Sequence, residues 1–272
     1  VFLSSPAVAS LMGDPPQARE PADVRQARPS VPLSDAYAAG YGASKWAGEI
    51  LLRHAHESFG LPVDVYRADM ILGHTVYRGQ LNTPDMFIRM LFSLATTGIA
   101  PESFYELDAG KRPLAHYDGL PVDFLAGAMV ELGRQRHEGF RTYNMINMHD
   151  GDGVSLDAIA DWVASAGYPI QRVAPHAAWL ERFGMKLRDL PEAQRQQSSL
   201  PIIDYFARPH PVKASGQASA DFEAAVAKLE VGPDVPHITE AYIHKHLDDM
   251  RLIGLLPPPP QGVKGATAAA NG

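Results

Sequence analysis

The first 150 residues alternate between short apolar runs and longer segments with helical spacing. Short runs typical of buried strands occur at 1–3, 63–66 and 142–147. Segments with helical spacing, each bounded by Gly or Pro, occur at 42–59, 83–98 and 122–133. Because strands alternate with helices, this part of the chain predicts an α/β fold with a mainly parallel sheet.

The rest of the chain is mostly helical and irregular. Helical spacing and cap residues predict helices at 155–167, 177–183, 222–229 and 239–253, with one short strand at 170–173. The segment 13–39 is rich in Pro, Asp, Ala and Arg without periodicity, which predicts a long loop. Residues 70–73 continue the preceding strand or turn after it. The proline-rich end, 257–272, predicts a disordered tail.

The composition excludes several functional classes. Net charge is -7 with the acidic residues scattered, and no basic stripe occurs, so we expect no nucleic-acid partner. No run of about 18 apolar residues is present, so we expect no membrane-spanning helix. The chain has no cysteine, which excludes disulfides, thiolate metal sites and cysteine nucleophiles and favours a cytoplasmic location.

The segment Tyr41-Gly42-Ala43-Ser44-Lys45 places a phenol and an ammonium four residues apart at the start of a predicted helix. Residues at this spacing lie on one helical face, one turn apart. A phenol exchanges a proton near neutral pH only if a nearby positive charge favours its anion, and a lysine one turn away supplies that charge. The pair therefore suits a tyrosine acid. The alternative is an exposed Tyr and Lys in the first turn of an ordinary helix.

Two neighbouring segments favour the catalytic interpretation. An apolar strand ends upstream at Ser4-Ser5, and another ends downstream of the helix near Arg67. The carboxyl ends of parallel strands meet at the sheet edge where ligands bind. We therefore expect Ser5 and Tyr41 to converge at this edge, with Ser4 as the rival for the hydroxyl role.

Several strings of the sequence resemble a known family. The second half of an extended short-chain dehydrogenase/reductase is indicated by Leu-Ser-Ser-x-x-Val at 3–8, Tyr-Gly-x-Ser-Lys-x-x-x-Glu at 41–49 and Tyr-Arg-x-x-x-Ile-x-Gly at 66–73. More narrowly, the chain resembles the thioester reductase domain at the C-terminal end of carboxylic acid reductases. The strings that carry this narrower resemblance lie at 67–74, 79–87, 115–124, 149–157 and 248–256. The resemblance extends from residue 1 to about residue 256.

The resemblance implies that NADP(H) reduces an acyl thioester, held on the phosphopantetheine arm of an acyl carrier domain, to an aldehyde. An adenylation domain is the other expected partner. The family pattern assigns the carbonyl hydrogen bond to Ser5, proton donation to Tyr41 and the cofactor ribose to Lys45. Val8, three residues after Ser5, matches the family spacing and favours Ser5 over Ser4. The expected cofactor contacts are Tyr41, Lys45, Ala68, Met70 and Ile71.

Further residues are expected to face the substrate. The broader superfamily commonly has Gly at the position of Asp69, whereas the thioester reductases share the carboxylate. We expect Asp69 to contact the pantetheine arm or to gate the pocket against free aldehyde. The alternative is a loop carboxylate that caps backbone N–H groups. By resemblance, His116 and Tyr117 are expected to line the acyl or pantetheine channel.

A cofactor motif is missing from the 272 residues, because no Gly-x-x-Gly-x-x-Gly or Gly-x-Gly-x-x-Gly follows a strand. That turn holds the dinucleotide pyrophosphate after the first strand of such folds. The chain also begins with Val rather than Met. We therefore predict an incomplete Rossmann-type sheet whose C-terminal half comprises 1–76 and 113–147. A mostly helical substrate subdomain would comprise 77–112 and 148–256, and the isolated chain would bind NADP(H) weakly or not at all.

Two other functions remain open. A sugar epimerase or dehydratase uses the same Ser, Tyr and Lys set, but it does not explain the string around Asp69. A catalytically silent binding fragment is the second alternative. No metal site is expected, because no His-Glu-x-x-His occurs and the turn Asp150-Gly151-Asp152 has too few carboxylates for a calcium loop.

Overall fold

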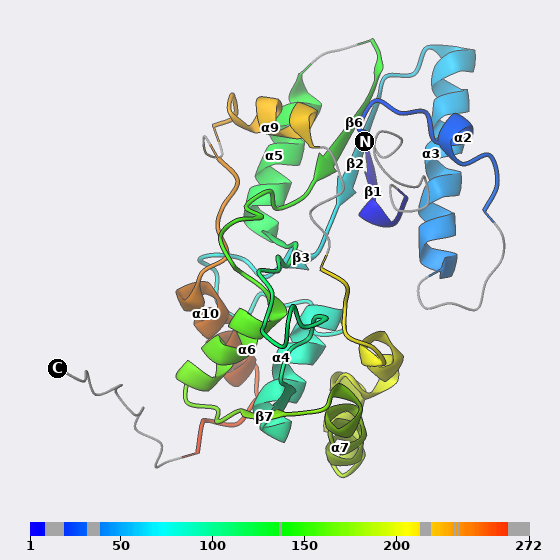
Figure 1. The fold of residues 1–272 in the computed structure, drawn as a ribbon. Helices are drawn as coiled ribbons and strands as arrows, with labels where there is room; N and C mark the ends of the chain where they lie inside the picture. Colours follow the sequence, from blue (N-terminus) through cyan, green and yellow to red (C-terminus); the bar gives the residue numbers. More distant parts are fainter. Residues whose placement is uncertain are drawn as a thin grey trace. The chain divides into compact units, whose positions relative to one another are not determined.

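The computed structural model describes residues 1–8, 19–31, 39–135, 138–212, 219–230, 232 and 234–260, which form two compact units (Figure 1). Unit 1 comprises Val1–Leu72, Tyr117–Asp150 and Lys213–His237. Unit 2 comprises Gly73–His116, Gly151–Val212 and Ile238–Gly272. Each unit is therefore assembled from three separate stretches of the sequence.

A three-stranded parallel sheet lies at the centre of unit 1. Its strand order is β1 (Phe2–Ser4), β2 (Val63–Ala68) and β6 (Phe140–Met145). All six residues of the central strand β2 are buried, as expected of a parallel strand covered on both faces. A short strand, β3 (Ile71–Leu72), follows β2 and pairs in parallel with β5 (Leu120–Pro121).

Helices lie on both sides of this sheet (Figure 1). On one side α3 (Ala39–Phe59) packs on β1 and β2, and the short helix α2 (Val24–Ala27) contacts α3. On the other side α5 (Val122–Arg134) contacts β2, and α9 (Ala220–Val226) contacts β6. The sheet of unit 1 is thus enclosed, which suits its mainly apolar strands.

Alternation along β2 decides which side chain faces which helix. Tyr66 and Ala68 belong to the buried apolar core that α5 and α9 share with the sheet. Arg67, between them in sequence, donates two hydrogen bonds to Glu49 of α3 and a longer one, at 3.5 Å, to Asn144 Oδ1 of β6. Successive side chains of a strand point to opposite faces, so Arg67 can face α3 while Tyr66 and Ala68 face the apolar core.

Unit 2 is mainly helical, with one two-stranded parallel pair, β4 (Ile99–Pro101) and β7 (Gln171–Val173). Its helices are α4 (Met86–Thr97), α6 (Leu156–Ser165), α7 (His176–Arg188), α8 (Glu192–Gln197), the 3-10 helix η1 (Leu200–Phe206) and α10 (Glu240–Leu252). An aromatic cluster fills its interior around Trp179, which is fully buried. No helix in the described stretches is both long and apolar enough to cross a membrane.

The predicted α/β class with parallel strands is confirmed, and most predicted elements are found within a few residues. The prediction of a structureless loop at 13–39 is wrong at α2, where Asp23 caps a single helical turn. The loop also includes 13–18 and 32–38, which lie outside the described residues, as does 261–272 of the predicted tail. The helix expected from Thr83 begins at Met86, because Asp85 accepts the N–H of Phe87 as its cap. The sequence patterns did not predict β4, α8 or η1.

One boundary also differs from the sequence prediction. The stretch 148–256 was assigned whole to the substrate subdomain, yet α9 packs on β6 within unit 1. Phe222 and Val226 of α9 are buried in the core of the sheet, and hydrophobic packing therefore decides the assignment. The functional roles predicted for the two units remain predictions.

Candidate active site

Helix α3 carries three chemically distinct side chains along one face: Tyr41, Lys45 and Glu49 are spaced by four residues each. The helix lies close against β1 where Gly48 faces Phe2. A Cβ atom at Gly48 would lie 2.5 Å from the Phe2 ring, so any larger residue would push the helix or the ring away. Glycine therefore sets the distance between this helix and the strand that precedes Ser5.

A buried ionic network fixes the same helix to the sheet. Arg67 on β2 donates to both carboxylate oxygens of Glu49, through Nε at 3.0 Å and Nη2 at 2.7 Å. Ser4 Oγ donates to Glu49 Oε1 at 2.5 Å. The side chains of Arg67 and Glu49 are 0% and 2% exposed, so the charges compensate each other away from water. The bidentate geometry restrains the rotation and register of α3 relative to β1 and β2.

One turn before Glu49, the ammonium of Lys45 lies next to the expected acid. Lys45 Nζ donates to the carbonyl oxygen of Leu3 at 2.9 Å, and it lies 5.5 Å from the centroid of the Tyr41 ring. Tyr41 itself is 53% exposed and remains accessible to a ligand. The predicted Tyr and Lys neighbours are thus found side by side, and the lysine bridges the helix to β1.

The two candidate hydroxyls at the end of β1 differ in their surroundings. The hydrogen of Ser4 Oγ is donated to Glu49 inside the ionic network, and Ser4 is 2% exposed. Ser5 Oγ accepts the N–H of Ala7 at 3.2 Å, a bond that does not use its hydroxyl proton. This difference supports the choice of Ser5 over Ser4 for a role that requires an O–H donor.

The residues expected beside the cofactor and substrate follow the carboxyl end of β2. Ala68 is the last residue of β2, and the N–H of Asp69 donates to the carbonyl oxygen of Met145 at the end of β6. Asp69 Oδ1 accepts the N–H of Met70 at 2.8 Å. This contact is the backbone-capping alternative foreseen for Asp69, and it engages one oxygen of the carboxylate. Ile71 then enters β3.

The expected channel residues His116 and Tyr117 fall in different compact units. His116 belongs to unit 2, where its Nδ1 lies 3.7 Å from Asp152 Oδ1. Tyr117 begins the second stretch of unit 1 and is 8% exposed. Their shared role at a channel remains a prediction.

Sequence reasoning gave no role to Glu49, Arg67 or Glu20. Glu49 could have been found from its helical spacing after Tyr41 and Lys45, and Arg67 from its place inside an apolar strand. Glu20 had no such signal. It is buried, accepts the N–H groups of Asn144, Asp221 and Phe222, and joins the segment 19–31 to β6 and α9. Burial raises the pKa of Glu20 to about 7.

These residues match only part of a dinucleotide site. The exposed phenol of Tyr41 and the ammonium of Lys45 fit the ribose and nicotinamide end of such a cofactor. The pyrophosphate end needs a glycine turn at a helix N-terminus, and the 272 residues contain no such motif after a strand.

Comparisons with known proteins show which families this chain resembles. A family model described as "Male sterility protein", of the NAD-binding type, matches residues 2–129. Carboxylic acid reductases from Mycobacterium marinum and Mycobacterium tuberculosis are 51% and 49% identical over 89% and 94% of this chain. The crystal structure of a nonribosomal peptide synthetase reductase (R) domain from Mycobacterium tuberculosis is 43% identical with a TM-score of 0.85, over 94% of this chain.

The chain spans only part of these relatives: 21% and 22% of the two carboxylic acid reductases and 60% of the R-domain chain. Its fold and its family match are those of the NAD(P)-binding Rossmann class of reductase domains. Within that class, the chain belongs to the reductase (R) domains of carboxylic acid reductases and nonribosomal peptide synthetases.

Proposed function

We propose that Ser5, Tyr41 and Lys45 catalyse the NADPH-dependent reduction of a carrier-bound acyl thioester to an aldehyde. The observation that carries the proposal is the position of α3, which places Lys45 Nζ against both the Tyr41 ring and the backbone of Leu3, two residues before Ser5. The similarity to carboxylic acid reductases supports the acyl substrate and the aldehyde product.

In this mechanism NADPH, when bound, supplies the hydride. Ser5 and Tyr41 hydrogen-bond the carbonyl oxygen of the thioester and hold it against the hydride donor. As negative charge develops on that oxygen, Tyr41 donates its proton and the ammonium of Lys45 stabilises the phenolate that remains. The resulting hemithioacetal breaks its carbon–sulfur bond, its hydroxyl proton passes to sulfur, and an aldehyde and a thiol are released.

The substrate would arrive on the phosphopantetheine arm of an acyl carrier domain, loaded by an adenylation domain. A Mycobacterium tuberculosis isonitrile lipopeptide synthase is 45% identical to this chain, which supports a carrier-dependent assembly line as the setting. We propose that Asp69, His116 and Tyr117 contact this arm.

The decisive variant is Tyr41→Phe in the longest natural polypeptide that carries this sequence. We expect kcat for aldehyde formation from an acyl-phosphopantetheine thioester to fall by about 100-fold or more, since proton donation typically contributes that much. Tyr77→Phe, at a tyrosine of unit 2 that is 66% exposed, is the matched control and should retain activity. A Tyr41→Phe enzyme within twofold of the parent rate would refute the proposal.

Two parallel assays address the alternatives. Turnover of a nucleotide sugar in place of the thioester would favour the epimerase or dehydratase. Aldehyde formation by the isolated 272 residues would contradict the silent fragment. The isolated chain is expected to bind NADPH weakly or not at all, and micromolar binding in titration calorimetry would overturn that expectation.

The gate proposed for Asp69 has its own test. Replacing Asp69 by Gly should let released aldehyde bind again and be reduced further, so the alcohol-to-aldehyde ratio should rise. Asp69→Asn preserves size and tests the charge. An unchanged product ratio in the Gly variant would leave Asp69 as a backbone cap only.

A further inference from the structure

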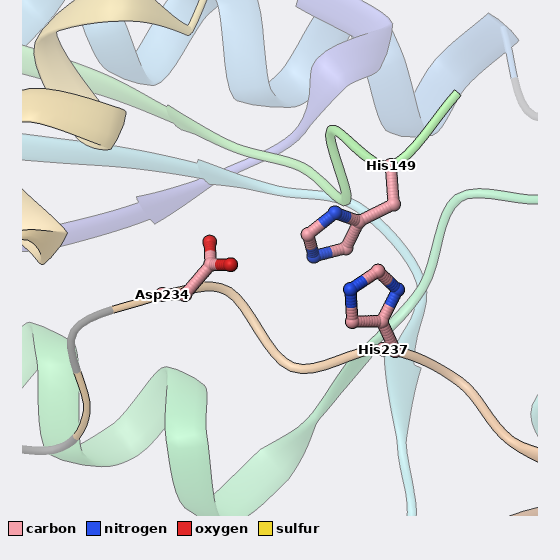
Figure 2. A group of neighbouring side chains, drawn as sticks. All are labelled: His149, Asp234 and His237. Atoms are coloured by element: carbon pink, nitrogen blue, oxygen red, sulfur yellow. The ribbon is translucent and has the colours of Figure 1, made fainter. Parts of the chain in front are cut away.

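Three side chains that do not belong to the Tyr41, Lys45 and Glu49 face of α3 gather at the carboxyl end of β6. His149 lies on the loop that follows β6, while Asp234 and His237 lie on the segment that follows α9. One ligand atom from each residue lies within 4.8 Å of the others. Figure 2 shows the two imidazole rings facing each other with the Asp234 carboxylate beside them. All three residues belong to unit 1.

The backbone under each ligand is anchored. The N–H of His149 donates to Asn147 Oδ1 at 3.1 Å, and Asn147 is fully buried and donates in turn to the carbonyl oxygen of Gly119 at 3.3 Å. Between Asp234 and His237, the side chain of Val235 is buried in the apolar core of the sheet. The donor atoms therefore extend from fixed points rather than from free loop tips.

A backbone oxygen adds a fourth donor. His149 Nε2 lies 2.7 Å from the carbonyl oxygen of Val235, so a proton on Nε2 is donated to that oxygen. A cation bound at this nitrogen would be held by the nitrogen and the oxygen together, with the single proton of the neutral ring moved to Nδ1. Asp234 Oδ1 accepts the N–H of Val235, which orients the carboxylate toward the same peptide.

The imidazole rings must turn before both can bind one ion. The rings of His149 and His237 stack with centroids 3.5 Å apart and an interplanar angle of 19°. Nitrogen lone pairs lie in the ring planes, so two nearly parallel rings cannot aim at one point. His237 is exposed, so we expect its side chain to rotate until its nitrogen points toward His149 and Asp234.

We propose that His149, Asp234 and His237 form a binding site for a divalent transition-metal ion of the Zn²⁺ class. Two imidazoles and one carboxylate suit Zn²⁺ better than the oxygen-seeking Mg²⁺ or Ca²⁺, and the exposed side leaves a position for water. The ion would join the end of β6 to a segment 86 positions away in sequence. The inference of this site does not rest on the proposed reductase activity.

The test is titration of the tag-free protein with ZnCl₂, followed by calorimetry, with Co²⁺ absorption as the spectroscopic signature. We expect one equivalent to bind, with the d–d bands of a site containing nitrogen ligands. At about a hundredfold excess over Kd, the melting temperature should rise by on the order of 5 °C. His237→Ala should weaken binding by at least about tenfold.

His54→Ala is the matched control, because His54 is also an exposed histidine near a carboxylate, 3.9 Å from Glu57. It should leave the tight site unchanged. Asp234→Asn should weaken Zn²⁺ binding while leaving the melting temperature without metal close to that of the parent. Equal Zn²⁺ affinity in the parent and in His237→Ala, or binding of Mg²⁺ in preference to Zn²⁺, would overturn the proposal.

Discussion

Beneath α3 in unit 1 lies a buried ionic network, whereas the interior of unit 2 around Trp179 is aromatic. In unit 1, Glu49 and Arg67 are bidentate partners with almost no exposure. In unit 2, Trp179 stacks on Phe183 at 5.0 Å and meets Phe104 edge-on at 5.6 Å. Aromatic burial supplies stability without a strict register, while a bidentate ion pair contributes little net stability but restrains orientation. The directional contacts lie where the candidate site needs α3 held in one position.

The largest expected loss of stability comes from a change in the aromatic cluster of unit 2. Trp179→Ala should lower the free energy of unfolding by about 3–5 kcal/mol, because it leaves a large cavity among fully buried rings. Hydrogen exchange should show the loss within unit 2. A change below about 1 kcal/mol would mean that the cluster collapses to fill the space and that unit 2 does not depend on it.

The buried ion pair of unit 1 allows a sharper test of the comparison. Glu49→Gln leaves the Arg67 charge buried without its counter-charge and should cost about 3 kcal/mol in denaturant unfolding. The double variant Glu49→Leu with Arg67→Met replaces the pair with apolar groups and should recover most of that loss. Its rate of thioester reduction should still be reduced, because α3 has lost its directional contact. Full activity in a stable double variant would contradict the positioning role.

The smallest expected effect concerns Glu20 and pH. Burial raises its pKa to about 7 in the folded chain, against an ordinary value of 4.5 for a glutamate in water. Between these values the folded state binds more protons than the unfolded state, so the free energy of unfolding should fall as pH rises. The stabilisation is fully present below pH 4.5 and is lost through pH 7, by up to about 3 kcal/mol.

Glu20→Gln should flatten this part of the stability curve, because the neutral amide does not titrate. Glu223→Gln, at an exposed glutamate of α9, is the matched control and should keep the slope of the parent. Parallel pH curves for the parent and Glu20→Gln would show that Glu20 does not cause the dependence.

Much of the local structure could be predicted, since caps and periodicity act over a few residues. Ser155 and Thr239 are the caps of α6 and α10, as their sequence context indicates. The unpredicted elements are those with weak local signals: α8 contains no buried residue, and β4 has only three residues. The assignment of α9 to unit 1 could not be predicted, because it depends on which apolar surface Phe222 reaches.

For the candidate site, the sequence alone determined the helix, the spacing of Tyr41 and Lys45, and the hydroxyls at the end of the first strand. Only the tertiary structure decided that Ser4 is bound to Glu49, that Glu20 holds α9, and that His149 lies beside His237. The physical reason is the distance along the sequence over which each kind of interaction acts. Helical spacing and caps are fixed by neighbouring residues, whereas contacts between distant segments depend on how the whole chain packs.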